Sequence, residues 1–290
     1  MKLRDILVNR EERRPRAGVR LALHLALLVA FVLLFEFAAV LLMVVTVGSI
    51  DSTQGMVFQS ATTLLAVTLS VRLARRFIDR RSMAGLGLQR GRAGRDLLFG
   101  VGVAAAMMAL IYLGELTLGW ARFDGYAWES APAGWLPDAA TWVVAFLMVG
   151  WYEELLTRGY WLVNLSEGLN RGLAVLITSV AFALLHAGNP SASYLSTAGL
   201  FASGLWFAYA AVASRGLWLP VGAHIGWNIF EGVVFGFPVS GLTTTVFIRQ
   251  TQLGPELWTG GPFGPEAGLI LLPALVFGAL AVWGYTRKRS

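Results

Sequence analysis

Long apolar stretches recur along this chain, and short polar segments separate them. A helix that crosses the hydrocarbon core of a bilayer needs about 20 mostly apolar residues, and eight stretches approach or exceed this length. We therefore expect an all-α polytopic membrane protein with about eight transmembrane helices packed as a bundle. The predicted spans cover residues 19–47, 56–73, 97–120, 139–163, 171–187, 194–213, 217–237 and 267–285.

The overall composition supports a location in lipid. Hydrophobic residues make up 56% of the 290 residues, charged residues only 14%, and the mean hydropathy is +0.63. A soluble domain of this length carries about 25% charged residues to cover its surface. The deficit indicates that much of the surface faces the bilayer rather than water.

Basic residues are concentrated in particular connections between the spans. The N-terminal tail, the segment 72–95 with its eight arginines and the stretch 287–289 are basic. The connections expected on the opposite side, at residues 48–55, 121–138, 188–193 and 239–266, contain only Arg122 and Arg249. Lys and Arg accumulate on the cytoplasmic side of membrane proteins, so both termini are predicted to be cytoplasmic. The net charge of +6 is explained in the same way, with membrane lipid as the partner of these arginines and no nucleic acid.

The chain has no cysteine, which excludes disulfides, thiolate metal sites and a cysteine nucleophile. Residues 1–18 form a basic tail, and the apolar run after them is too long for a cleaved signal peptide. No internal repeat or boundary divides the sequence, so residues 1–290 are predicted to form a single integral membrane domain. Frequent Arg, Ala and Gly favour a bacterial inner (plasma) membrane.

A small set of polar residues falls inside the predicted spans. An ionisable side chain at the bilayer centre costs at least about 2.5 kcal/mol on insertion scales, so each one calls for a partner or a function. Those that qualify are His24, Glu36, Glu115, Glu153, Glu154, Arg158, His186, His224, Asn228 and Glu231.

Two adjacent glutamates lie in the fourth span. Residues four apart share one face of a helix, which pairs Glu154 with Arg158. Glu153 points about 100° away, where it can face the bundle interior as a carboxylate that exchanges protons. The alternative is a purely structural cluster in which both glutamates share Arg158.

A histidine near the end of the fifth span can lie close to Glu153. His186 follows Phe182 by four residues, so the phenyl ring can wall one side of the imidazole. A lone histidine on an apolar helix is more often a packing residue than a catalyst. However, Glu153 and His186 are equally distant from the turn at 169–170, and an antiparallel helical hairpin places them at similar depth.

The seventh span offers a second histidine together with an amide. His224 and Asn228 are four apart on one face, and the small residues Gly222 and Gly226 permit close approach of another helix. Glu231 lies on much the same face and is a rival participant, although a supporting contact is favoured. Packing or interfacial roles are expected for the residues without catalytic companions at helical spacing, namely His24, Glu36 and Glu115.

Taken together, these residues form three motifs in order on three helices. They are Glu-Glu-x-x-x-Arg at 153–158, Phe-x-x-x-His at 182–186 and His-x-x-x-Asn at 224–228. The set resembles the CAAX prenyl protease and bacteriocin-processing (CPBP, or Abi) family of intramembrane endopeptidases. The resemblance covers residues 139–237 as the catalytic core.

The resemblance implies a helical membrane fold with a cytoplasm-facing polar cavity and an enzyme that cleaves peptides or membrane proteins near the cytoplasmic surface. Prenylated CAAX proteins are one substrate class of this kind. Glu153 and His186 would activate water, while His224 and Asn228 would stabilise the oxyanion. The supporting residues would be Glu154, Arg158 and Phe182.

Three alternatives remain open from the sequence. His-Glu-x-x-His is absent, so no metal cofactor is expected, but a zinc-dependent version could use Glu153, His186 and His224 as ligands. The polar cluster could also be a proton relay in a transporter, which usually shows paired halves or broken spans. A non-catalytic peptide-binding immunity protein is the third possibility. Water activation explains why Asn228 accompanies His224, and it favours the hydrolase.

Overall fold

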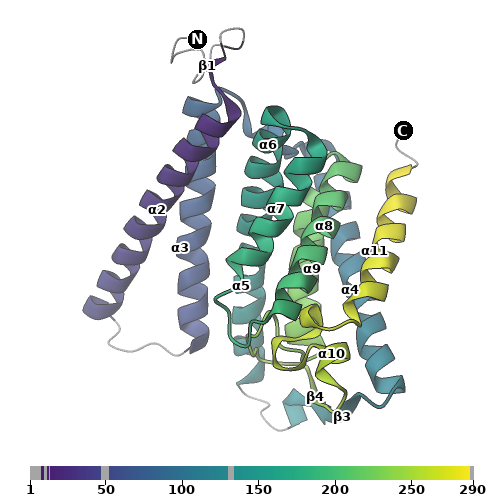
Figure 1. The fold of residues 1–290 in the computed structure, drawn as a ribbon. Coiled ribbons are helices and arrows are strands. Elements are labelled where there is room, and N and C mark those ends of the chain that lie inside the picture. The colour runs from purple at the N-terminus through teal and green to yellow at the C-terminus, as the bar shows by residue number, and fades with distance from the viewer. Residues whose placement is uncertain (1–7, 10–11, 13, 47–51, 130–133, 288–290) are drawn as a thin grey trace.

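The computed structural model describes residues 8–9, 12, 14–46, 52–129 and 134–287. Within them the chain is a helical bundle whose helices run roughly antiparallel, with both termini at the same end (Figure 1). Short strands add two small antiparallel sheets. The fold class is therefore the predicted all-α polytopic membrane protein.

A helix stands at each of the eight predicted spans. Five helical stretches are long and apolar enough to cross a membrane: Ala17–Leu42, Gln54–Ile78, Arg90–Thr117, Trp135–Gly168 and Tyr194–Ser214. The stretches Arg171–Leu185 and Leu271–Thr286 are apolar but shorter. The regular helices are α2 (Ala17–Thr46), α3 (Ser52–Leu73), α4 (Ala93–Thr117), α5 (Trp135–Glu154), α6 (Leu162–Gly168), α7 (Arg171–Leu185), α8 (Tyr194–Ser214), α9 (Trp218–Asn228), α10 (Glu256–Thr259) and α11 (Leu271–Thr286).

Two of the predicted spans continue through π-helical turns. Between α5 and α6 the chain forms η5 (Leu155–Trp161), and α9 passes into η6 (Ile229–Val234). A third π segment, η1 (Ala74–Ile78), follows α3. Such wide turns inside helices occur frequently at functional sites, and η5 carries Arg158.

The α9 helix is buried in the centre of the bundle and packs most extensively against α4. Glycines allow this approach: a Cβ added at Gly222 would lie 2.1 Å from the Leu97 carbonyl oxygen, and one at Gly100 would lie 2.3 Å from that of Leu219. The predicted role of Gly222 and Gly226 in close packing is confirmed. The α9 helix is thereby held directly against the backbone of α4.

The other helices surround this pair. The α2 and α3 hairpin stands at one side of the bundle, where α3 packs on α5, and α11 closes the other side against α4 and α8 (Figure 1). Side-chain caps fix two turns: Asn170 accepts from the Leu173 amide at 2.9 Å, and Ser193 forms a capping box with Ser196.

The end of the bundle opposite the termini carries a small sheet that the sequence did not predict. The strand β3 (Ala121–Tyr126) pairs antiparallel with β4 (Ile248–Gln252), and α10 lies beside them (Figure 1). Two further short strands, β1 (Val8–Asn9) and β2 (Arg14–Pro15), pair near the N-terminus. Short 3-10 turns occur at Met83–Leu86, Arg90–Arg92, Ala127–Glu129, Gly261–Phe263 and Pro265–Ala267.

Candidate active site

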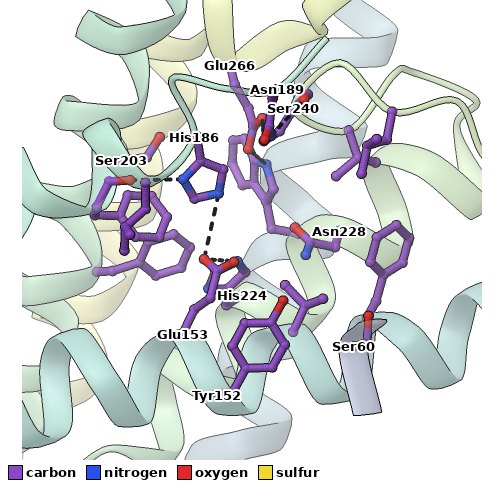
Figure 2. A pocket seen from close by; sticks show the side chains of 18 of the residues that line it. Ser60, Tyr152, Glu153, His186, Asn189, Ser203, His224, Asn228, Ser240 and Glu266 are labelled. Atoms are coloured by element: carbon purple, nitrogen blue, oxygen red, sulfur yellow. Dashed lines mark hydrogen bonds and ion pairs between the residues drawn. The ribbon is translucent and has the colours of Figure 1, made fainter. Parts of the chain in front are cut away.

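A cavity of about 370 Å³ lies inside the bundle, and the four predicted catalytic residues all line it. Glu153 comes from the last turn of α5, His186 directly follows α7, and both His224 and Asn228 come from α9. Figure 2 shows the imidazole of His186 and the carboxylate of Glu153 pointing toward each other. Three helices that are distant in sequence thus converge on one point.

The Glu153 carboxylate faces both histidines. Its Oε2 lies 3.7 Å from Nε2 of His186 and 3.9 Å from Nε2 of His224. This oxygen is buried and has no hydrogen-bond partner within the part of the chain that the structure describes. The predicted proximity of Glu153 and His186 is therefore confirmed.

The other nitrogen of each ring is held by a hydrogen bond. His186 Nδ1 lies 2.8 Å from the Phe182 carbonyl oxygen, which can only accept, so Nδ1 carries a proton. His224 Nδ1 lies 2.9 Å from Glu154 Oε1, a carboxylate that also bonds to Arg158. In the neutral rings both Nε2 atoms are then acceptors that face a third acceptor, Glu153 Oε2. Such a set of acceptors is suited to bind a proton donor or a cation between its members.

Glu154 belongs to a separate, fully buried ion pair. Its Oε1 accepts from Arg158 at 2.9 Å, and the guanidinium also bonds to the Thr157 hydroxyl and to the Gly204 carbonyl oxygen. The predicted pair is confirmed. The alternative cluster, with both glutamates bonded to Arg158, is wrong because the guanidinium hydrogen bonds go to Glu154 and leave Glu153 facing the cavity.

Aromatic rings enclose this ion pair and the histidines. The ring centroids of Phe182 and His186 are 4.9 Å apart, as the helical spacing predicts. The guanidinium carbon of Arg158 lies over the same phenyl ring, 4.3 Å from its centroid. Phe207 of α8 stacks on His224 at 4.9 Å and also contacts Arg158. Cation–π contact and ring stacking therefore hold the charged pair and both imidazoles in one packed unit.

Phe207 and a carboxylate at the far wall of the cavity were not predicted. Glu266 accepts from Trp227 Nε1 at 3.2 Å and from the Ser240 hydroxyl, and Asn189 Nδ2 donates to the Ser240 carbonyl oxygen (Figure 2). Burial raises the pKa of the Glu266 carboxyl above its usual value. No sequence pattern pointed to Glu266, because it stands in an irregular Gly and Pro segment with no helical spacing to a histidine.

The remaining polar residues of the spans lie away from the cavity. Glu231 is fully buried on η6 but does not line it, which weakens its candidacy as a participant. The other three make contacts that agree with the packing or interfacial roles expected for them. His24 packs on the Tyr160 ring at 4.2 Å, Glu36 accepts from Thr62 at 2.7 Å and Glu115 accepts from Gln252 at 2.7 Å.

The fit of the cluster to a metal ion can be judged from its donors. A carboxylate and two imidazole Nε2 atoms are suitable zinc ligands, and two donors on a tetrahedral zinc lie about 3.3 Å apart. The observed separations from Glu153 are wider, at 3.7 and 3.9 Å. Among the described residues, no group of three His, Asp or Glu side chains is placed to hold a metal as it stands.

Comparison with known proteins agrees with the motifs. Residues 134–230 match the family model described as type II CAAX prenyl endopeptidase Rce1-like. Comparisons with curated proteins and with solved structures gave no match. The matched range contains Glu153, His186, His224 and Asn228. The chain is an integral membrane protein, and its residues 134–230 are similar to this membrane-protease family, in agreement with the resemblance drawn from the sequence.

Proposed function

We propose that this protein is an intramembrane endopeptidase in which Glu153 and His186 activate a water molecule. The observation that carries the proposal is the unbonded Glu153 Oε2 at the cavity wall, 3.7 and 3.9 Å from two imidazole Nε2 atoms. A water that donates one hydrogen bond to Glu153 and another to His186 satisfies both acceptors. As its oxygen attacks a peptide carbonyl carbon, Glu153 or His186 takes up one of its two protons and the other stays on the oxygen.

The following steps use the other two residues. Attack forms a bond between the water oxygen and the carbonyl carbon and places negative charge on the carbonyl oxygen. His224 is suited to receive this oxyanion, because its Nδ1 is held by the Glu154 carboxylate and, in the imidazolium form, its Nε2–H can donate to the oxyanion. Asn228, one turn further along α9, supplies an amide N–H from the same wall.

Collapse of the tetrahedral intermediate completes the reaction. The C–N bond breaks, and the proton taken up by Glu153 or His186 passes to the departing amine, so that one water is consumed per peptide bond. Glu154 and Arg158 orient His224 without contacting the substrate, and Phe182 and Phe207 keep both rings in place. The mechanism needs no metal, whereas a zinc-dependent protease using Glu153, His186 and His224 is the second candidate.

A comparison of membrane proteomes tests the proposal. Cells that contain the wild-type chain are compared with cells that contain Glu153→Ala at the same level, and peptide fragments are identified by mass spectrometry. We expect at least one fragment that is present with the wild type and lost with the variant. Identical fragment sets would contradict an endopeptidase and favour a non-catalytic binding or transport role.

A further inference from the structure

The two ends of the bundle differ sharply in charge. Among the Lys and Arg residues that the structure describes, only Arg122 and Arg249 lie in the connections at the end that carries the β3 and β4 sheet. Both are matched by carboxylates, Arg122 with Asp124 at 2.7 Å and Arg249 with Glu129 at 3.7 Å. The other end carries both termini, the segment 72–95 and the turns with Arg171 and Arg215 (Figure 1). The positive-inside tendency assigns this arginine-rich end to the cytoplasm.

The cavity extends toward the opposite end. Its lining includes Asn189, Ser240 and Glu266, which all belong to connections at the sheet end. None of the described residues in the turns at the arginine-rich end lines it. The α3 helix contributes side chains only from its first three turns, between Met56 and Thr63, and that part of α3 also lies at the sheet end.

Depth along the helices places Glu153 and His186 near the middle of the bundle, so the lining of the cavity decides the direction. His186 follows α7, whose 15 residues begin at Arg171, so it lies about 22 Å along the helix from the arginine-rich end. Glu153 is at the same depth, because the continuous helical stretch through η5 and α6 ends at Gly168. Beyond His186 the chain enters the loop with Asn189 at the sheet end.

We propose that the peptide substrate reaches Glu153 from the non-cytoplasmic side of the membrane. This inference rests on the proposed function and names its substrate class: exported peptides, or outward-facing stretches of membrane proteins. It differs from the cytoplasm-facing cavity and the cytoplasmic cleavage that the family resemblance implies. With cytoplasmic termini, the connections that line the cavity lie on the non-cytoplasmic side.

Cysteine labelling tests the orientation without any need for catalysis, since the chain has no native cysteine. Thr243 is exposed beside the cavity-lining Leu242, and Ser82 is exposed at the arginine-rich end. An impermeant maleimide applied to intact cells should label Thr243→Cys, and it should label Ser82→Cys only after permeabilisation. The reverse pattern would overturn the inference.

Vesicles of known orientation test the access of substrate. A mixture of quenched fluorescent decapeptides is added outside right-side-out and inverted membrane vesicles that contain the wild-type chain, with Glu153→Ala vesicles as the background. We expect cleavage by right-side-out vesicles, at least tenfold faster than by inverted ones. Faster cleavage by inverted vesicles would refute the inference. If the peptides are cleaved neither by the two kinds of vesicle nor by the protein in detergent, the result contradicts the proposed function and not the orientation. The orientation is then tested by cysteine labelling alone.

Discussion

Glu153 and Glu154 are neighbours in the chain, yet their surroundings differ completely. Glu154 is bonded to Arg158 and His224 in a fully buried cluster, whereas Glu153 faces the cavity and both Nε2 atoms. The rotation of about 100° per helical residue produces this difference, and it could be predicted from sequence alone. The depth of His186 could also be predicted, because a hairpin conserves distance from its turn.

Other features of the site depend on contacts that no local pattern records. Phe207 is one of many aromatic residues on apolar helices, and its stacking on His224 follows from how α8 packs on α9. Glu266 reaches the cavity from an irregular segment, and its place depends on Trp227 and Ser240. Side chains supplied across helix interfaces or by loops were therefore the part of the site that the sequence did not predict.

Removal of the buried arginine should destabilise the fold. Arg158→Ala removes the guanidinium that pairs with the buried Glu154, and breaking a buried ion pair costs about 3 to 5 kcal/mol. Arg171→Ala is the matched control, because Arg171 is exposed at the start of α7 and surface changes usually stay within about 0.5 kcal/mol. Thermal unfolding in detergent and accumulation in membranes measure both. An Arg158→Ala protein that accumulates and melts like the wild type would show that the ion pair does not stabilise the fold.

Activity should survive removal of metal ions. Glu153 and His186 can polarise water unaided, and their separations are wider than those of ligands on one zinc. The purified protein is dialysed exhaustively against a chelator, its metal content is determined and its turnover of peptide is compared with that of the untreated sample. Loss of turnover that one equivalent of zinc restores would replace the present mechanism with the zinc-dependent one.

At the scale of the elements, the apolar stretches correctly predicted a helix at each of the eight spans. A stretch of about 20 apolar residues has few structural alternatives in lipid. The wide turns η5 and η6 were not predicted. An i to i+5 turn differs from an α-helical turn by one inserted residue and leaves no mark in the apolar pattern. The long span at 139–163 is accordingly a helix of three parts, from Trp135 to Gly168.

The contact between α4 and α9 should not tolerate a larger side chain. Gly222→Ala places a Cβ 2.1 Å from the Leu97 carbonyl oxygen, so the backbone must shift, at a cost of about 1 to 3 kcal/mol for overpacking. Gly102→Ala on α4 is the control, since a Cβ there meets nothing within 4 Å. We expect a lower melting temperature in detergent for the first variant only. Equal melting of the two variants would mean that the helices can separate without cost.

At the scale of the whole molecule, two sequence features predicted that the termini lie at one end of the bundle: the uneven distribution of arginines and the even number of eight spans. Figure 1 shows the termini at the same end. The pairing of β3 with β4 could not be predicted, because their residues are more than a hundred positions apart and neither strand is strongly apolar. The direction of the cavity is likewise a property of the assembled bundle. It decides which side of the membrane supplies the peptide.

The most direct test of the account compares Glu153→Gln with Glu154→Gln on one peptide substrate in detergent. Both variants keep the shape of the side chain, and each is first checked for normal accumulation and melting. Loss of the general base should reduce kcat of Glu153→Gln by about 10² to 10⁴, while Glu154→Gln, which still offers an acceptor to His224, should lose less. Near wild-type turnover by Glu153→Gln beside a folded but inactive Glu154→Gln would contradict the assignment of Glu153 as the base.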